Sequence, residues 1–118
     1  MKVMVLGASP KEERYSNKAM KMLQAFEHDV VAIGGRENES HGIKIYKGFQ
    51  AVREVATITM YLGEDRQAEY YGYIIGLAPK RIIFNPGAEN AALAELAKAQ
   101  GIEVVEACTL VMLRTGQF

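Results

Sequence analysis

The chain has 118 residues, of which 49% are hydrophobic and 24% charged, which are ordinary values for one globular domain. Its fourteen basic residues balance its fourteen acidic ones, which disfavours nucleic acid or an anionic membrane as partner, since both usually select a basic face. One cysteine excludes an internal disulfide framework, and no apolar run approaches the roughly 20 residues of a membrane span, so we expect a cytoplasmic protein.

The first predicted element is a strand at residues 3–6, whose unbroken apolar run is typical of a strand buried on both faces of a parallel sheet. Gly7 ends this run. From residue 17 to residue 26, apolar side chains fall at helical spacing and predict a helix with one apolar face that includes Phe26. Strand, glycine turn and helix form the front half of a nucleotide-binding βαβ unit, where phosphate binds unpaired N–H groups at the helix start.

The rest of the chain continues to alternate between strand and helix. Further strands are predicted at residues 30–33, 43–46, 55–62, 81–84 and 102–105, and further helices at residues 64–75 and 90–100. This alternation predicts an α/β fold. We expect one Rossmann-like domain over residues 1–118, with a mostly parallel twisted sheet of about five to six strands and helices on both faces.

Four details of the connections are also predicted. Polar residues 36–42 predict a loop, which makes the strand at 43–46 an edge strand protected by lysines. Residues 48–54 can hold one or two helical turns, with Phe49 and Val52 inward. Ala68 is expected on the inward face of the next helix, and Gly76 as its C-terminal cap. The apolar tail at residues 110–113 is expected to close the core, the alternative being contact with a second subunit. Cys108 before it is expected to be a small buried thiol.

The loop after the first strand is the first candidate site. It is longer and more polar than the G-x-G-x-x-G turn of dinucleotide-binding domains. Its small residues still allow backbone N–H groups to face a phosphate, and hydroxyl and basic side chains add donors and charge. The candidate ligand-binding residues here are Gly7, Ala8, Ser9, Arg14, Ser16, Asn17 and Lys18. The alternative is an ordinary strand-to-helix loop in which Ser16 or Asn17 caps the helix.

The tip of the second strand carries a base where an NAD site carries an acid. An acidic residue about twenty positions after the glycines binds the ribose 2′-hydroxyl of NAD. Here the strand ends in Gly34, Gly35 and Arg36, which disfavours NAD and favours a ligand with a phosphate on its ribose, either NADP or coenzyme A. The alternative is that Arg36 is an ordinary solvated loop residue.

Two later strand tips point to the same edge of the sheet. Met60, Tyr61 and Leu62 could form an apolar edge for a nucleobase or ribose, or could simply be buried in the core. Asn85, Pro86 and Gly87 join a strand to a helix that Asn90 could cap. The asparagines and glutamate of this turn exceed what a turn requires, so they could hydrogen-bond a ligand or hold the turn.

With these loops in view, the chain resembles the family of stand-alone coenzyme A-binding domains, small Rossmann-like proteins related to part of the succinyl-CoA synthetase alpha subunit. The residues that carry the resemblance are Gly7, Ala8, Ser9, Tyr15, Ser16, Gly42, Tyr46, residues 85–90, residues 101–106 and Cys108. The resemblance implies that coenzyme A lies across the strand tips, with its pyrophosphate near Gly7, Ala8 and Ser9. The chain departs from the family where Gly34 and Gly35 replace a usual Asn-Pro, and where residues 55–57 lack a usual aspartate.

Catalytic machinery is not evident in the sequence. His28 and His41 lie in no partner pattern, and two distant histidines with one cysteine cannot form a zinc site. The sequence therefore favours non-catalytic binding of coenzyme A or an acyl-CoA, with a homodimer or a partner enzyme both open. The alternatives are a minimal NADP-dependent oxidoreductase, and a regulatory or interaction domain whose nucleotide site has decayed.

Overall fold

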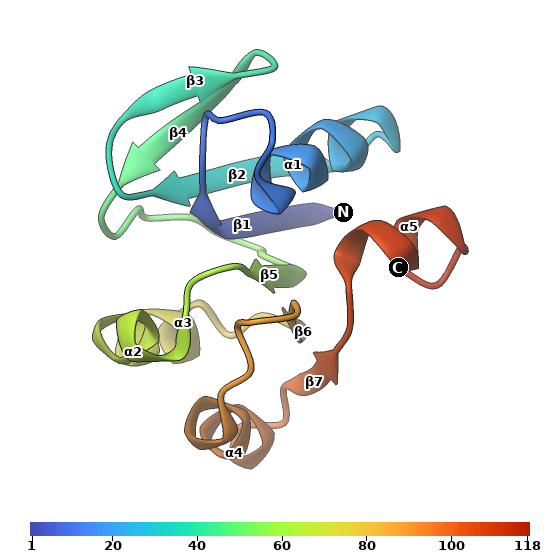
Figure 1. Ribbon diagram of the computed structural model, residues 1–118. Coiled ribbons are helices and arrows are strands. Elements are labelled where there is room, and N and C mark those ends of the chain that lie inside the picture. The colour runs from blue at the N-terminus through green and yellow to red at the C-terminus, as the bar shows by residue number, and fades with distance from the viewer.

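The computed structural model describes all 118 residues and contains one seven-stranded sheet (Figure 1). Its strands are β1 (Lys2–Ala8), β2 (Asp29–Gly34), β3 (Asn38–Ser40), β4 (Ile43–Lys47), β5 (Thr57–Met60), β6 (Arg81–Phe84) and β7 (Glu103–Glu106). They lie in the order β3-β4-β2-β1-β5-β6-β7, from top to bottom in Figure 1. Every neighbouring pair is parallel except β3 with β4.

Helices cover both faces of this sheet. They are α1 (Tyr15–Ala25), α2 (Glu64–Gln67), the 3₁₀ turn η1 (Ala68–Tyr70), α3 (Tyr71–Leu77), α4 (Ala91–Ala99) and α5 (Thr109–Arg114). On one face, α1 and α5 pack against Val3 and Val5 of β1. On the other, α3 and α4 pack against Met4 and Leu6, because successive strand side chains point to opposite faces. The predicted α/β, Rossmann-like fold class is confirmed.

The strand order creates a switch point at the centre of the sheet. From β1 the chain builds β2 and β4 on one side, and then returns to build β5, β6 and β7 on the other. Ligands of open α/β sheets bind in the crevice outside the carboxyl ends of the strands at such a point. Here that point is flanked by the tips of β1 and β5 and by the start of α1.

The prediction of a loop at residues 36–42 is wrong in part, because the segment contains strand β3. His41 and Gly42 turn the chain from β3 into β4 with φ values of 54° and 74°, as in tight two-residue hairpin turns. β3 consists of three polar residues, so it carries no apolar alternation that sequence reasoning could detect. The sheet therefore exceeds the predicted five to six strands, and β4 is not at its edge.

The helical turns predicted at residues 48–54 do not form. Phe49 is 59% exposed rather than inward, whereas Val52 packs against the core as predicted. A distant side chain supplies the hydrogen bonds that a helix would have made. The Tyr73 hydroxyl donates to the carbonyl oxygen of Gln50 at 2.6 Å and accepts from its N–H at 3.2 Å.

The predicted helix at residues 64–75 is divided into α2, η1 and α3, and it extends to Leu77. Ala78 ends it in the left-handed conformation with φ of 49°, so the prediction of Gly76 as the cap is wrong. Ala68 is exposed rather than inward, whereas Ile74 of the same segment is fully buried. Phe26 follows the last residue of α1 and is 51% exposed, so the apolar face of α1 is shorter than predicted.

The C-terminal tail closes the core as predicted. Leu110, Met112 and Leu113 of α5 are buried, and Leu113 packs against the β1 face covered by α1. Strand β7 is only partly buried because it lies at the sheet edge. One expectation nearby is wrong: Cys108, just before α5, is half-buried rather than enclosed.

Gly34 and Gly35 differ in the space around them, which gives a matched test of the packing between strand tips. A Cβ atom at Gly34 would overlap the carbonyl oxygen of Ala8 and lie 2.9 Å from Cγ2 of Ile45. We expect Gly34→Ala to lower the free energy of unfolding by about 1–3 kcal/mol, the usual cost of overpacking. Gly35→Ala meets nothing within 4 Å and should leave it nearly unchanged. Urea denaturation of both variants measures the difference, and equal stabilities would contradict this account.

Candidate functional site

A cavity of about 430 Å³ lies at the carboxyl ends of β1, β2, β5 and β6, beside the start of α1. Ten of the residues proposed from the sequence line it: Gly7, Ala8, Ser9, Arg14, Ser16, Gly34, Gly35, Tyr61, Leu62 and Pro86. Six others complete the lining: Tyr15, Ile33, Gly63, Arg66, Glu69 and Tyr70. The fold thus gathers four segments that are distant in the sequence around one hollow.

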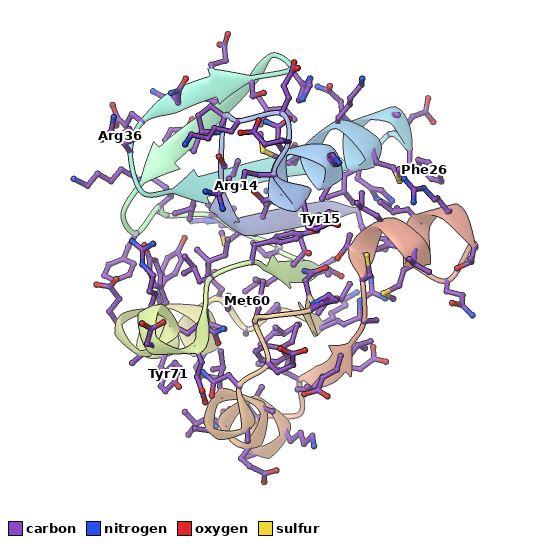
Figure 2. The ribbon with its side chains drawn as sticks, viewed as in Figure 1. Arg14, Tyr15, Phe26, Arg36, Met60 and Tyr71 are labelled. Carbon is purple, nitrogen blue, oxygen red and sulfur yellow. The ribbon has the colours of Figure 1, made fainter.

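The remaining six sequence candidates lie outside the lining of this cavity. Met60 is fully buried in the core, and Asn17 and Asn85 are buried in polar networks described below. Arg36 is exposed at the outer corner between β2 and β3 (Figure 2). The exposed Lys18 places its ammonium over the Tyr15 ring, 5.4 Å from the ring centroid. The N–H of the exposed Gly87 donates to Glu89 at 2.9 Å, a local bond within the turn.

Gly7 lets the tips of β1 and β5 approach each other. It has φ of 99° and sits where the pairing of β1 with β2 shifts register between Leu6 and Ala8, which is a β-bulge. A Cβ atom at this position would lie only 2.8 Å from the backbone nitrogen of Leu62. A side chain here would therefore force apart the two tips that form the floor of the cavity.

The start of α1 opens onto the cavity without a side-chain cap. Arg14 precedes the helix in an extended conformation, and no side chain accepts from the first N–H groups. Helix α4 differs, since Oδ1 of Asn90 accepts from the N–H of Leu93 at 3.0 Å, as the sequence predicted. The uncapped N–H groups and the positive end of the helix dipole favour an anion at the start of α1.

Asn17 holds the first loop from within the protein. Its Nδ2 donates to the carbonyl oxygen of Ser9 and to Oγ of Ser40, both at 2.8 Å, and its Oδ1 lies 2.7 Å from Nε2 of His41. Oγ of Ser9 also accepts from the N–H of Lys11 at 3.2 Å. With its polar atoms satisfied inside the protein, Asn17 positions the loop and ties it to the β3–β4 turn.

Two arginines line the cavity without a carboxylate partner. Arg14 comes from the side of the sheet covered by α1, and Arg66 from α2 on the opposite side. The only ion pair within 4.0 Å in the protein joins Lys98 and Glu95, far along the chain on α4. Both guanidinium groups are therefore free to pair with an anionic ligand. They line the cavity, whereas the basic side chain of Arg36 does not.

Sequence reasoning predicted Tyr61 and Leu62 after β5 but missed the contribution of α2 and η1, which follow them. Arg66, Glu69 and Tyr70 are spaced i, i+3 and i+4, so one helical surface presents all three to the cavity. This spacing was the available signal. Glu69 also brings a carboxylate into the cavity. The sequence has no acid at the tip of β2, and this carboxylate comes instead from η1.

Asn85 joins β5, β6 and α5 instead of facing the cavity. Its Nδ2 donates to Oγ1 of Thr59 at 2.8 Å and to the carbonyl oxygen of Met60 at 2.9 Å, and its Oδ1 accepts from the N–H of Thr109 at 2.9 Å. The Tyr61 hydroxyl is buried nearby without a hydrogen bond of its own. Burial raises the pKa of Tyr61 to about 12.

No three His, Cys, Asp or Glu side chains are grouped so that they could hold a metal ion. None of the helices has the length and apolar character that crossing a membrane would require.

Comparison with known proteins identifies the family. A family model of a CoA binding domain matches residues 1–114. The chain belongs to this CoA-binding domain family. No curated protein matches it.

Solved structures with this fold cover almost the whole chain. A crystal structure of an uncharacterized protein is 40% identical, with a TM-score of 0.96, covering 99% of this chain and 97% of its own. A hypothetical protein from Pyrococcus horikoshii is 23% identical, with a TM-score of 0.86 and coverage of 96% and 81%. A Thermus thermophilus protein is 19% identical, with a TM-score of 0.86 and coverage of 99% and 90%. The last two comparisons show the shared fold.

Proposed function

We propose that this CoA-binding domain holds coenzyme A or an acyl-CoA across the carboxyl ends of β2, β1, β5 and β6, as a binding protein without chemistry of its own. The observation that carries the proposal is the uncapped start of α1, which opens onto the cavity beside two arginines without ion-pair partners. Backbone N–H groups, a helix dipole and guanidinium groups together suit a ligand with several phosphates.

The pyrophosphate is proposed to lie between the turn of Gly7, Ala8 and Ser9 and the first residues of α1. Arg14 is beside this position and comes from the loop that leads into α1. The start of α2 is a poorer phosphate site, because Glu64 and Asp65 occupy its first turn. Like charges there would repel a phosphate and direct it toward α1.

The ribose phosphate of coenzyme A has two candidate partners. The sequence predicted Arg36, but the exposed Arg36 is not in the cavity lining, whereas Arg66 is. We therefore favour Arg66. A charge-assisted hydrogen bond is worth roughly 1.5–3 kcal/mol, so removing the ribose phosphate should weaken binding about tenfold to a hundredfold.

Calorimetric titration with coenzyme A, dephospho-coenzyme A, NADP and NAD tests the proposal. Coenzyme A should bind more tightly than dephospho-coenzyme A and NAD, because both of these lack the ribose phosphate. Equal or tighter binding of NAD would contradict the assignment. Binding of NADP with protein-dependent oxidation of NADPH would instead favour the oxidoreductase alternative, and binding of none would favour a decayed site.

A further inference from the structure

Three aromatic side chains form a cluster at one end of the cavity, which we call the aromatic wall: Phe49, Tyr70 and Tyr73. The Phe49 ring centroid lies 5.2 Å from that of Tyr70, edge to face, and 5.1 Å from that of Tyr73. The centroids of the two tyrosines are 6.4 Å apart. Tyr70 itself lines the cavity, and the exposed Phe49 and the half-buried Tyr73 pack against its ring.

The wall is held in place although it is exposed. Phe49 is 59% exposed and sits on a segment without helix or strand. The residue after it, Gln50, has both backbone polar groups bound by the Tyr73 hydroxyl, at 2.6 Å and 3.2 Å. A large apolar ring fixed in this way beside a cavity is pre-organised to contact a ligand, since its ordering cost does not have to be met on binding.

The strand order places the aromatic wall two strands away from the turn of Gly7, Ala8 and Ser9. Gly7, Ala8 and Ser9 belong to the tip of β1, Gly34 and Gly35 to the adjacent β2, and Phe49 follows β4, one strand further along. Neighbouring strands are about 4.8 Å apart. A ribose above the tip of β2 would therefore carry its base to the wall, while its 5′ phosphates stay at α1.

The chemistry of this end favours a nucleobase over an acyl chain. Base–aromatic stacking suits any planar π face, and Tyr70 offers such a surface. Glu69 lines the cavity next to Tyr70 and can accept hydrogen bonds from ribose hydroxyl groups. Arg66 lies one helical turn before Tyr70, so a phosphate attached to the same ribose would meet a guanidinium group.

We propose that the aromatic wall is the base-stacking end of the site and that Tyr70 binds the adenine base of the ligand by stacking on it, with Phe49 and Tyr73 as positioning residues. This inference rests on the proposed binding of coenzyme A, and it assigns the direction in which the ligand lies. The pantetheine arm then runs the other way, past Leu62 toward Pro86 at the tip of β6.

The binding of coenzyme A and of two of its fragments tests whether the aromatic wall binds the base. Calorimetry would compare coenzyme A, adenosine 3′,5′-bisphosphate and 4′-phosphopantetheine on the wild-type chain, Tyr70→Ala, Tyr70→Phe and Phe49→Ala. Tyr70→Ala should weaken the two adenine ligands by about 5- to 100-fold and leave 4′-phosphopantetheine unchanged. Tyr70→Phe keeps the ring and should retain wild-type affinity, and Phe49→Ala should give a smaller loss than Tyr70→Ala.

Phe26→Ala is the matched control, because Phe26 is a similarly exposed phenylalanine at the far end of α1 from Arg14 and Tyr15 (Figure 2). It should bind all three ligands like the wild-type chain. If Tyr70→Ala bound the adenine ligands with unchanged affinity, or lost as much affinity for 4′-phosphopantetheine, the aromatic wall would not be the base-stacking end of the site. The proposed function would remain intact. If the wild-type chain bound neither adenine ligand, both the role of the aromatic wall and the proposed binding of coenzyme A would be wrong.

Discussion

Removing both arginines that line the cavity, in Arg14→Ala/Arg66→Ala, is expected to weaken coenzyme A binding by at least about a hundredfold. Each guanidinium group is proposed to make a charge-assisted contact worth roughly 1.5–3 kcal/mol. Partial exposure to solvent weakens such contacts, so we take the lower end, about tenfold for each residue. Neither arginine has an ion-pair partner to lose, so the substitutions should leave folding intact.

The single variants separate the two proposed roles. Arg14→Ala should weaken coenzyme A and dephospho-coenzyme A alike, because both ligands carry the pyrophosphate. Arg66→Ala should weaken only coenzyme A, so that the two ligands then bind equally. Arg36→Ala tests the partner predicted from the sequence, and Arg114→Ala, outside the cavity on α5, controls for net charge. If Arg36→Ala alone made the two ligands equal, Arg36 and not Arg66 would bind the ribose phosphate.

Salt dependence gives this experiment a second readout. Contacts between guanidinium groups and phosphates are screened by salt, so wild-type affinity should fall as ionic strength rises. The double variant should show a flatter dependence, because it has lost two of the charges that face the ligand. Parallel salt curves for the wild-type chain and the double variant would show that neither arginine meets a phosphate.

The second large effect is expected on stability, from Asn85→Ala. The Asn85 side chain is 2% exposed, and its substitution removes three hydrogen bonds that join β5, β6 and the start of α5. The buried N–H of Thr109 would lose its acceptor, and an unsatisfied buried group costs about 1–3 kcal/mol. With the lost packing, we expect a decrease of about 2–4 kcal/mol in the free energy of unfolding, a large share of the usual 5–15 kcal/mol.

Urea denaturation measures this decrease, with Asn38→Ala as the matched control. Asn38 is exposed, and its side chain accepts only from the neighbouring N–H of Glu39 at 2.8 Å. That control should stay within about 0.5 kcal/mol of the wild-type chain, as surface substitutions usually do. A similarly small effect at Asn85 would mean that water replaces its bonds and that this position is open enough to meet a ligand.

The local elements of this protein were largely predictable from the sequence. The apolar run that became β1, the glycine that ends it and the helical spacing that became α1 are all local signals. Alternation of strands with helices then implied a mostly parallel sheet with both faces covered, and the sheet has this arrangement except for β3. These features followed because a buried strand and an amphipathic helix each leave a periodic pattern over a few residues.

Short or polar segments were less predictable. The β3–β4 hairpin has no apolar alternation, and its turn depends on His41 and Gly42 taking positive φ values. The segment around Phe49 can form helical turns by local preference, yet Tyr73 binds its backbone from 23 positions away. In both segments, contacts that local sequence does not encode overrode weak propensities.

At the candidate site, the sequence by itself indicated which strand tips would meet, and ten of its candidate residues line one cavity. Only the tertiary structure decided which polar side chains are free to meet a ligand. Asn17 and Asn85 are occupied by partners 8 to 26 positions away, whereas Arg66 and Glu69 enter the cavity from a helix not suspected of contributing. The reason is physical: burial and hydrogen-bond satisfaction are properties of the folded neighbourhood, and residues distant in sequence supply that neighbourhood.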